Sequence, residues 1–261
     1  MTTVALNVPH PKLRPIALPT EHGGWGLLFE PLVIALAIRP SAAGALLAGA
    51  TIFAFLARQP LKLALQDSLR GRSSARTRYC RLFAAMYLVA AAIALGAAVK
   101  LAGTTLLIPV GLVIPLALTT ILFDANHRSR DLLPELCGTV AMSSSAAAVA
   151  IAGGMRVVPA LALSAIVLAR AIPSVVYVRT LLRRAHGRAA SSWPVLLLHG
   201  AAVVTVSLFA PPLVTLAMAM LLVRAIWGLT HVPPRAQTIG WREVGYGVAT
   251  IALVVAGHRW R

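Results

Sequence analysis

Charged residues are scarce in this chain, and acidic residues are the scarcest of them: only seven of the 261 residues are Asp or Glu. Charged residues make up 12% of the sequence, about half of the roughly 25% with which a soluble domain covers its surface. The sequence is also 59% hydrophobic, with a mean hydropathy of +0.82. A water-soluble fold has no means of hiding so much apolar side chain, so we expect lipid to surround most of this protein.

Cysteines and familiar enzyme motifs are also few or missing. Two cysteines, Cys80 and Cys137, lie in or beside basic loops, which predicts neither a disulfide nor a cysteine metal site. The sequence contains no Walker loop, Gly-rich dinucleotide loop or Ser-His-Asp signature. The formal net charge of +17 would indicate nucleic acid in a soluble protein, but no soluble basic module is present to bind it. We therefore expect no nucleic-acid partner and attribute the cations to loops that face anionic membrane lipids.

Long apolar runs fill most of the chain and predict an all-α polytopic membrane protein. A spanning helix needs about 20 mostly apolar residues, and nine segments meet or approach this length. They cover residues 22–38, 41–62, 82–99, 103–123, 136–154, 157–178, 193–209, 212–228 and 240–257. Residues 1–20 carry four prolines and predict an interfacial lead-in rather than a cleaved signal peptide. We expect one integral membrane domain over residues 1–261.

The distribution of charged residues predicts the orientation of these segments. With a cytoplasmic N-terminus, the inner loops hold 17 of the 24 cations and the outer loops hold five, which follows the positive-inside rule. The remaining two, Arg170 and Arg224, lie within predicted spans. Six of the seven acids lie at the predicted cytoplasmic edge, and Glu30 alone lies near the middle of a span. We therefore expect the polar chemistry of this protein at its cytoplasmic face.

Several cations lie too deep in the predicted spans to be plain headgroup anchors. They are Arg58, Lys62, Arg170, Arg179 and Arg224, with Tyr177 between two of them. Two interpretations stay open: these side chains snorkel to the interface, or they line a cavity open to the cytoplasm and bind phosphate or carboxylate. An ionisable residue within a span usually faces a partner. We therefore predict that Glu30 faces the bundle interior near Arg170 or Arg224.

The densest polar stretch is "DANHRSRDLLPE", residues 124–135. Its carboxylates, Asp124, Asp131 and Glu135, would suit a divalent cation such as Mg²⁺, because hard cations prefer oxygen ligands. Asn126 and Arg128 would then contact the phosphate that this cation holds. The alternative, equally open, is an Arg–carboxylate network that fixes the loop against the membrane, with acids at the start of a helix.

The string "PTEHGGW", residues 19–25, resembles the Pro-x-Glu-His-Gly-x-Trp signature of the bacterial YwiC-like membrane proteins. Three later stretches are similar to other recurrent blocks of that family: "ARQPLKL" at 57–63, "FDANHRSRDLLPELCG" at 123–138 and "ARAIPSVVYVR" at 169–179. The resemblance therefore extends over nearly the whole chain. It implies a multi-pass protein of the bacterial inner membrane.

Nine helices with polar loops on the cytoplasmic side also resemble, more distantly, the intramembrane prenyltransferases of the UbiA superfamily. That resemblance implies a UbiA-like bundle in which Asp-rich motifs after helices 2 and 6 bind magnesium and a prenyl diphosphate. This chain departs from the pattern, since the loop after its second span has only Asp67 and the loop after its sixth has no carboxylate. Guanidinium groups would then hold the phosphates directly.

Three functions are compatible with these patterns. The first is a UbiA-like transferase acting on an isoprenoid diphosphate or another anionic lipid-like substrate, whose head group Glu30, Tyr177 and the deep cations would bind. The catalytic candidates for that reaction are Glu21, His22, Asp67 and Asp131. The second function is a transporter of a small anion or lipid, and the third is a non-enzymatic accessory membrane protein. The sequence leaves the substrate and the oligomeric state open.

Overall fold

The computed structural model describes residues 13–19, 22–71 and 73–260. Every regular element within these ranges is a helix, so the predicted all-α fold is confirmed there. The elements are α1 Arg14–Ala17, α2 His22–Ile38, α3 Ala42–Leu69, α4 Ala75–Ala102, η1 Thr104–Leu106, α5 Leu107–Ala125, α6 Leu132–Ser143, α7 Ser145–Ala152, α8 Val157–Ala185, α9 Trp193–Ser207, α10 Pro212–Thr230 and α11 Ala236–Arg259.

Each of the nine predicted apolar segments coincides with one helix or with two consecutive ones. Among the described residues, seven helical segments are long and apolar enough to cross a membrane, taking η1 with α5 and α6 with α7. Two further apolar helices, Gly23–Ile38 and Trp193–Ser207, are shorter. The chain is therefore built as a multi-pass membrane protein, while nine crossings and a cytoplasmic N-terminus stay predictions.

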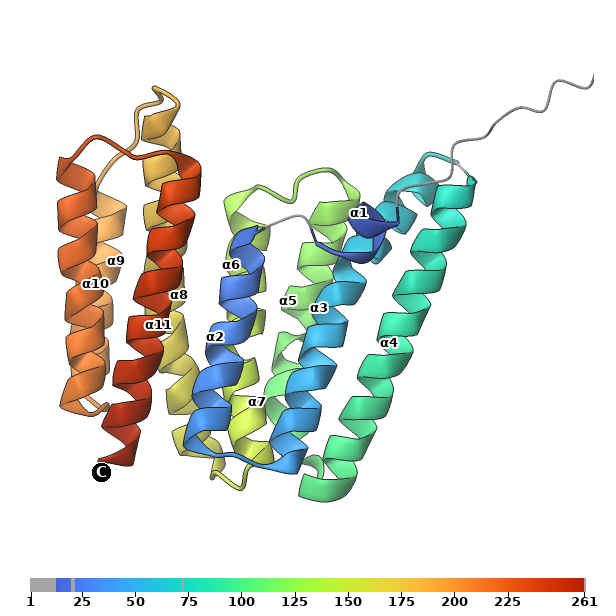
Figure 1. The fold of residues 1–261 in the computed structure, drawn as a ribbon, viewed down its shortest axis with the longest axis horizontal. Helices are drawn as coiled ribbons and strands as arrows, with labels where there is room; N and C mark the ends of the chain where they lie inside the picture. The colour runs from blue at the N-terminus through green and yellow to red at the C-terminus, as the bar shows by residue number, and fades with distance from the viewer. Residues whose placement is uncertain (1–12, 20–21, 72, 261) are drawn as a thin grey trace, which may run out of the picture.

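The helices form a bundle whose longest dimension runs across the helix axes (Figure 1). Helix α4 lies at one edge beside α3, and α9 and α10 lie at the opposite edge. About half of the residues in the α6–α7 and α8 spans are buried, against 11% in α4. The centre of the bundle is therefore formed by α7 and α8, with α2 packed against both, whereas α4 presents most of its apolar surface outward.

The connections alternate between the two ends of the bundle. Those between α3 and α4, α5 and α6, α8 and α9, and α10 and α11 lie at the same end as α1, at the top of Figure 1. The C-terminus lies at the other end. We call these ends the α1 side and the C-terminal side. All the loops that the positive-inside rule assigns to the cytoplasm lie on the α1 side.

Serine and glycine residues fix several helix ends. Ser41 Oγ accepts the Gly44 N–H at 2.9 Å at the start of α3, and Ser74 and Thr77 form a reciprocal capping box at the start of α4. Helix α4 ends at Gly103, whose φ of 81° lies in the left-handed region that glycine adopts at little cost. These positions determine where the chain leaves one helix and turns toward the next.

A side chain from α8 bridges the break between α6 and α7. Ser164 Oγ accepts the Ala147 N–H at 2.9 Å and donates to the Ser143 carbonyl at 3.0 Å, and both contacts are buried. Backbone polar groups left unpaired in an apolar interior cost several kcal/mol each. Ser164 therefore supplies the hydrogen bonds that the interrupted helix lacks, and it joins α7 to α8.

Candidate functional site

Two groups of polar side chains connect helices that are far apart in the sequence. The first, which we call the interhelical network, comprises Glu30 on α2, Arg170 and Ser174 on α8, His199 on α9, Arg224 on α10 and Glu243 on α11. The second, the Asp124 cluster, comprises Arg58, Lys62 and Gln66 on α3, Asp124 on α5 and Ser129 in the following loop.

Glu30 and Arg170 form an ion pair in the interior. Glu30 Oε1 and Arg170 Nε lie 2.8 Å apart, and each side chain is 7% exposed. These two atoms do not meet hydrogen-bond geometry, so the attraction between them is mainly that of opposite charges. Gly247 of α11 lies over the pair, because a Cβ at that position would be 3.3 Å from Arg170 Nη2. The prediction that Glu30 faces the bundle interior near Arg170 or Arg224 is confirmed.

Arg224 forms the second ion pair of the network. Its Nη1 donates to Glu243 Oε1 at 2.5 Å. Its Nη2 lies 3.4 Å from Ser174 Oγ and 3.1 Å from His199 Nε2. The other ring nitrogen of His199 lies 2.8 Å from the Val195 carbonyl. His199 is thus an interhelical hydrogen-bonding residue with both nitrogens engaged.

The charges of the network lie well inside the helices. At a rise of 1.5 Å per residue, Glu30, Arg224 and Glu243 lie about 9–12 Å from the α1-side ends of their helices. Arg170 and Arg224 are 6% and 4% exposed, so neither side chain snorkels to the surface. Charges at such depth are tolerated when they face partners, and here two carboxylates offset two guanidinium groups.

Two tyrosine rings enclose the Arg224 guanidinium. Its Cζ lies 4.3 Å from the centroid of the Tyr177 ring and 5.3 Å from that of Tyr246, both within cation–π distance. Tyr177 also contacts the His199 ring edge to face, with centroids 6.3 Å apart. The rings therefore hold the guanidinium in one orientation, with its nitrogens directed at their partners.

A pocket of about 240 Å³ opens beside Arg224. We call it the α8–α10–α11 pocket, and its lining comprises Tyr177, Leu181, Arg224, Trp227, Pro234, Ile239, Arg242, Glu243 and Tyr246. Because Pro234 belongs to the connection between α10 and α11, the pocket lies toward the α1 side of the bundle. Its wall combines two cationic side chains, one carboxylate side chain and two tyrosines with apolar side chains.

The two cations of this pocket, Arg224 and Arg242, carry several N–H donors each. A guanidinium group carries five N–H donors, and Nε of Arg224 is buried without a hydrogen-bond partner in the part of the chain that the structure describes. Arg242 is exposed and stacks on Trp227, with its Cζ 5.3 Å from the ring centroid. Because Arg224 and Arg242 both line the pocket, it is suited to an anion that meets the two guanidinium groups together.

Substitution of Gly228 tests whether the pocket wall is tightly packed. A Cβ at Gly228 would collide with the hydroxyl of Tyr177, a ring that is 6% exposed and has little room to move. We expect Gly228→Ala to lower the free energy of unfolding by about 1–3 kcal/mol through overpacking. Gly240→Ala is the matched control, because no atom lies within 4 Å of the added Cβ. Equal unfolding temperatures of the two variants in detergent would contradict the packing described.

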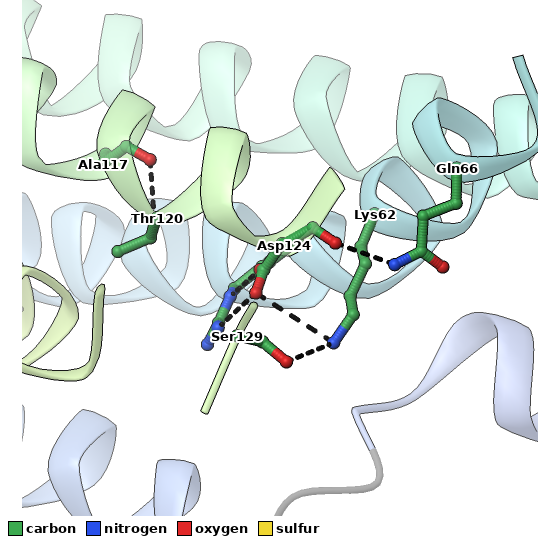
Figure 2. Close-up of polar contacts among 7 residues, drawn as sticks. Lys62, Gln66, Ala117, Thr120, Asp124 and Ser129 are labelled. Atoms are coloured by element: carbon green, nitrogen blue, oxygen red, sulfur yellow. Dashed lines mark hydrogen bonds and ion pairs between the residues drawn. The ribbon is translucent and has the colours of Figure 1, made fainter. Parts of the chain in front are cut away.

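The Asp124 cluster surrounds a carboxylate that is completely buried. Arg58 donates to its two oxygens from Nε at 2.8 Å and from Nη2 at 3.2 Å. Figure 2 shows Lys62 reaching both Asp124 and Ser129, while Gln66 donates to the main-chain carbonyl of Asp124 at 2.7 Å. The cluster therefore ties α3 to the end of α5.

Arg58 is not among the residues that line the α8–α10–α11 pocket. It borders a hollow of only about 10 Å³, together with Pro19, Phe55, Gln59 and Lys62, which has room for about one water molecule. The three deep arginines that the sequence groups together thus belong to two separate sites.

The other predicted metal ligands face separate arginines. Asp131 pairs with Arg128 at 2.7 Å, and Glu135 pairs with Arg179. No three side chains of the metal-ligating types converge within the described ranges. These contacts fit the Arg–carboxylate network that was the alternative to a metal site. Binding of Mg²⁺ by these carboxylates stays a prediction.

Two further predicted site residues, Asp67 and Asn126, have their contacts outside the interhelical network. Asp67 contacts Arg76 and, at 2.8 Å, the hydroxyl of Thr77 near the start of α4. Asn126 is exposed and donates to the Leu122 carbonyl at 2.8 Å. Outside the described residues lie Glu21 and the side chain of His22.

Sequence reasoning missed the other charged or aromatic residues of the pocket, namely Trp227, Arg242, Glu243 and Tyr246. A signal was present in "WREVGY", residues 241–246, which brings an acid and a cation into an apolar segment. The last span was predicted over 240–257, whereas α11 begins at Ala236. Glu243 therefore lies two turns inside a helix rather than at its edge.

Comparison with known proteins finds one similarity. A family model described as "YwiC-like protein" matches residues 18–151, from the residue after α1 through most of α7. No curated protein and no solved structure matches the chain. The resemblance to this family is therefore confirmed over about half of the chain, and its extension over the rest stays a prediction. Glu30 and the Asp124 cluster lie within the matched residues, whereas the block at 169–179 and the α8–α10–α11 pocket lie beyond them.

Proposed function

The chain belongs to the YwiC-like protein family, and we propose that it binds an anionic, lipid-like ligand in the α8–α10–α11 pocket, as a multi-pass protein of the bacterial inner membrane. The ligand class is an amphiphile with a phosphate or similar head group, of which an isoprenoid diphosphate is one example. The observation that carries this proposal is the pocket lining, in which the guanidinium groups of Arg224 and Arg242 stand beside aromatic and apolar side chains.

The charge around the pocket supports an anionic ligand. Four exposed arginines lie in or beside the α1-side ends of α8 and α11, namely Arg183, Arg188, Arg235 and Arg242. The pocket lining contains a single carboxylate, that of Glu243. A concave site with an excess of one charge concentrates ligands of the opposite charge.

The shape and level of the pocket support an amphiphile. At about 240 Å³ it is smaller than the roughly 300–1,000 Å³ that encloses a whole drug-sized ligand, so it holds a head group while the tail extends along the bundle. Three exposed tryptophans lie near the same ends of the helices: Trp193, Trp227 and Trp241. Tryptophan prefers the membrane–water interface, and this level gives access to both lipid headgroups and solutes.

An enzymatic form of the proposal is a UbiA-like transfer reaction on a prenyl diphosphate. Arg224 and Arg242 would hold the diphosphate, and the hydroxyls of Tyr177 and Tyr246 would face it. The carboxylates predicted to hold magnesium lie in separate ion pairs on other helices, so the pocket residues support binding more directly than they support a transfer step.

Transport is the second candidate function. The network places two ion pairs inside the membrane-spanning helices, and such intramembrane charges often mark transport pathways. Uptake of a labelled anionic amphiphile into proteoliposomes would separate a carrier from a protein that only binds. An accessory role would show neither uptake nor specific binding.

Binding to the purified full-length protein in detergent tests the proposal. Farnesyl diphosphate supplies both head and tail, farnesol lacks the anionic head, inorganic diphosphate lacks the tail, and dioctanoyl phosphatidic acid represents a membrane phospholipid. We expect at least one of the two anionic amphiphiles to bind at least about tenfold more tightly than both farnesol and inorganic diphosphate. This factor corresponds to a difference in binding free energy of about 1.4 kcal/mol. The stronger of the two amphiphiles identifies the source of the head group.

Two arginine variants then locate the site. We expect Arg242→Gln to weaken binding about tenfold, because it removes an exposed cation of the pocket lining. Arg235→Gln removes an exposed cation at the start of the same helix, outside the lining, and should change the affinity less than about twofold. Equal losses in the two variants, or no binding by the wild type, would overturn the proposal.

A further inference from the structure

Glu243 already provides Arg224 with a carboxylate. The Arg224 guanidinium lies within cation–π distance of two tyrosine rings, and its Nη2 is directed at Ser174 and His199. Its Nη1 is held by Glu243, which also lines the pocket. An anion that enters the pocket therefore meets an arginine whose terminal nitrogen is engaged by the protein's own acid.

We propose that Glu243 is a resident competitor that makes this pocket select phosphate-headed over carboxylate-headed amphiphiles. This inference rests on the proposed function and adds the residue that determines specificity. A ligand carboxylate offers Arg224 the same chemistry that Glu243 provides. Because Glu243 is tethered, its effective concentration is at least about millimolar, and a free carboxylate gains little by replacing it.

A phosphate head group has two advantages over Glu243. It carries up to two negative charges and three acceptor oxygens, and it suits bidentate contact with guanidinium groups. It can therefore take the place of Glu243 at Nη1 of Arg224 and at the same time reach Arg242, which lines the same pocket. These additional contacts favour the replacement of Glu243 by a phosphate head group but not by a carboxylate head group.

The two members of the pair differ in their freedom to move. The Arg224 side chain is 3% exposed, whereas that of Glu243 is 18% exposed. The Arg224 guanidinium is held by the two tyrosine rings and by its contacts with Ser174 on α8 and His199 on α9. The Glu243 carboxylate is therefore the partner that moves away when a ligand binds.

A purely structural role for the pair makes the opposite prediction. If Glu243 only joined α11 to α10, removing its charge would weaken the binding of every ligand through loss of order in the pocket. If Glu243 competes, removing its charge strengthens the binding of carboxylates. The sign of the effect therefore separates the two roles.

The experiment compares farnesyl diphosphate with farnesoate, which has the same apolar tail and a carboxylate head. For the wild type we expect farnesyl diphosphate to bind at least about 30-fold more tightly. For Glu243→Gln we expect farnesoate to bind at least about fivefold more tightly than it binds the wild type, so that the preference narrows. Ser174→Ala is the matched control, because it removes a neutral contact of Arg224 and should leave the preference unchanged.

Glu243→Asp provides the same comparison if the glutamine variant does not fold. The shorter side chain keeps its charge but is drawn back from Arg224, and farnesoate binding should rise by a smaller factor. Selection by Glu243 is refuted if Glu243→Gln and Glu243→Asp weaken the binding of both ligands alike, or leave the ratio of the two affinities unchanged. Ligand binding in the pocket still stands in that case, provided that Arg242→Gln weakens binding more than Arg235→Gln does. If the wild type binds no anionic amphiphile, both are refuted.

Discussion

Replacing Arg170 with methionine is expected to lower the free energy of unfolding by about 3–5 kcal/mol, because it leaves the Glu30 carboxylate buried without its cation. The pair lies 2.8 Å apart with both side chains 7% exposed, so water cannot solvate the remaining charge. Unfolding of the purified protein in detergent, followed by its helical circular dichroism, measures the loss. This is the largest single-residue effect that the structure predicts.

A double substitution separates the lost ion pair from lost packing. Replacing a buried pair by apolar residues of similar volume is often neutral or stabilising. We therefore expect Glu30→Leu combined with Arg170→Met to regain more than half of the stability lost by Arg170→Met alone. The double-mutant cycle gives the coupling energy of the two residues. Without such recovery, the importance of Arg170 would lie in other contacts, such as the Glu243 carbonyl 3.4 Å from its Nη2.

Asp124→Asn should produce the second-largest loss, about 2–3 kcal/mol, because the neutral amide no longer offsets two nearby cations. Arg58 contacts both oxygens of Asp124, and Lys62 lies 4.0 Å from one of them. The substitution keeps the size of the side chain, so it removes charge without opening a cavity. The unfolding free energy in detergent is again the measurement.

Asp131→Asn is the control for that prediction. Asp131 also pairs with an arginine, Arg128, but the two side chains are 41% and 65% exposed. Exposed ion pairs contribute at most about 1 kcal/mol, so this variant should stay close to the wild type. Similar losses for Asp124→Asn and Asp131→Asn would show that burial does not set the strength of these pairs.

The partner of Glu30 could be predicted because acids are so scarce in this sequence. A lone carboxylate within a span needs a cation at similar depth, and only Arg170 and Arg224 offered one. The same scarcity of charge defined the apolar segments, each of which is helical in the structure. The composition of a segment and the depth of a residue within its span were sufficient for these inferences. Both can be read from one segment of the sequence without knowing how the helices pack.

The division of the deep arginines into two sites could not be predicted in this way. Depth along a helix does not determine which helices are neighbours, and Arg58 on α3 meets α5, whereas Arg224 on α10 meets α11. The pocket was missed for a related reason. A difference of four residues at the start of α11 moves Glu243 from the helix edge to its interior, and boundaries read from sequence carry errors of this size.

A structure of the protein in lipid nanodiscs with farnesyl diphosphate would test most directly whether the α8–α10–α11 pocket binds an anionic amphiphile. We predict density for the head group within hydrogen-bond distance of Arg224 and Arg242, with Glu243 withdrawn from Arg224 and the tail running along the bundle surface. A head group bound at the Asp124 cluster, or a pocket in which Arg224 and Glu243 stay paired while the ligand lies elsewhere, would contradict this account.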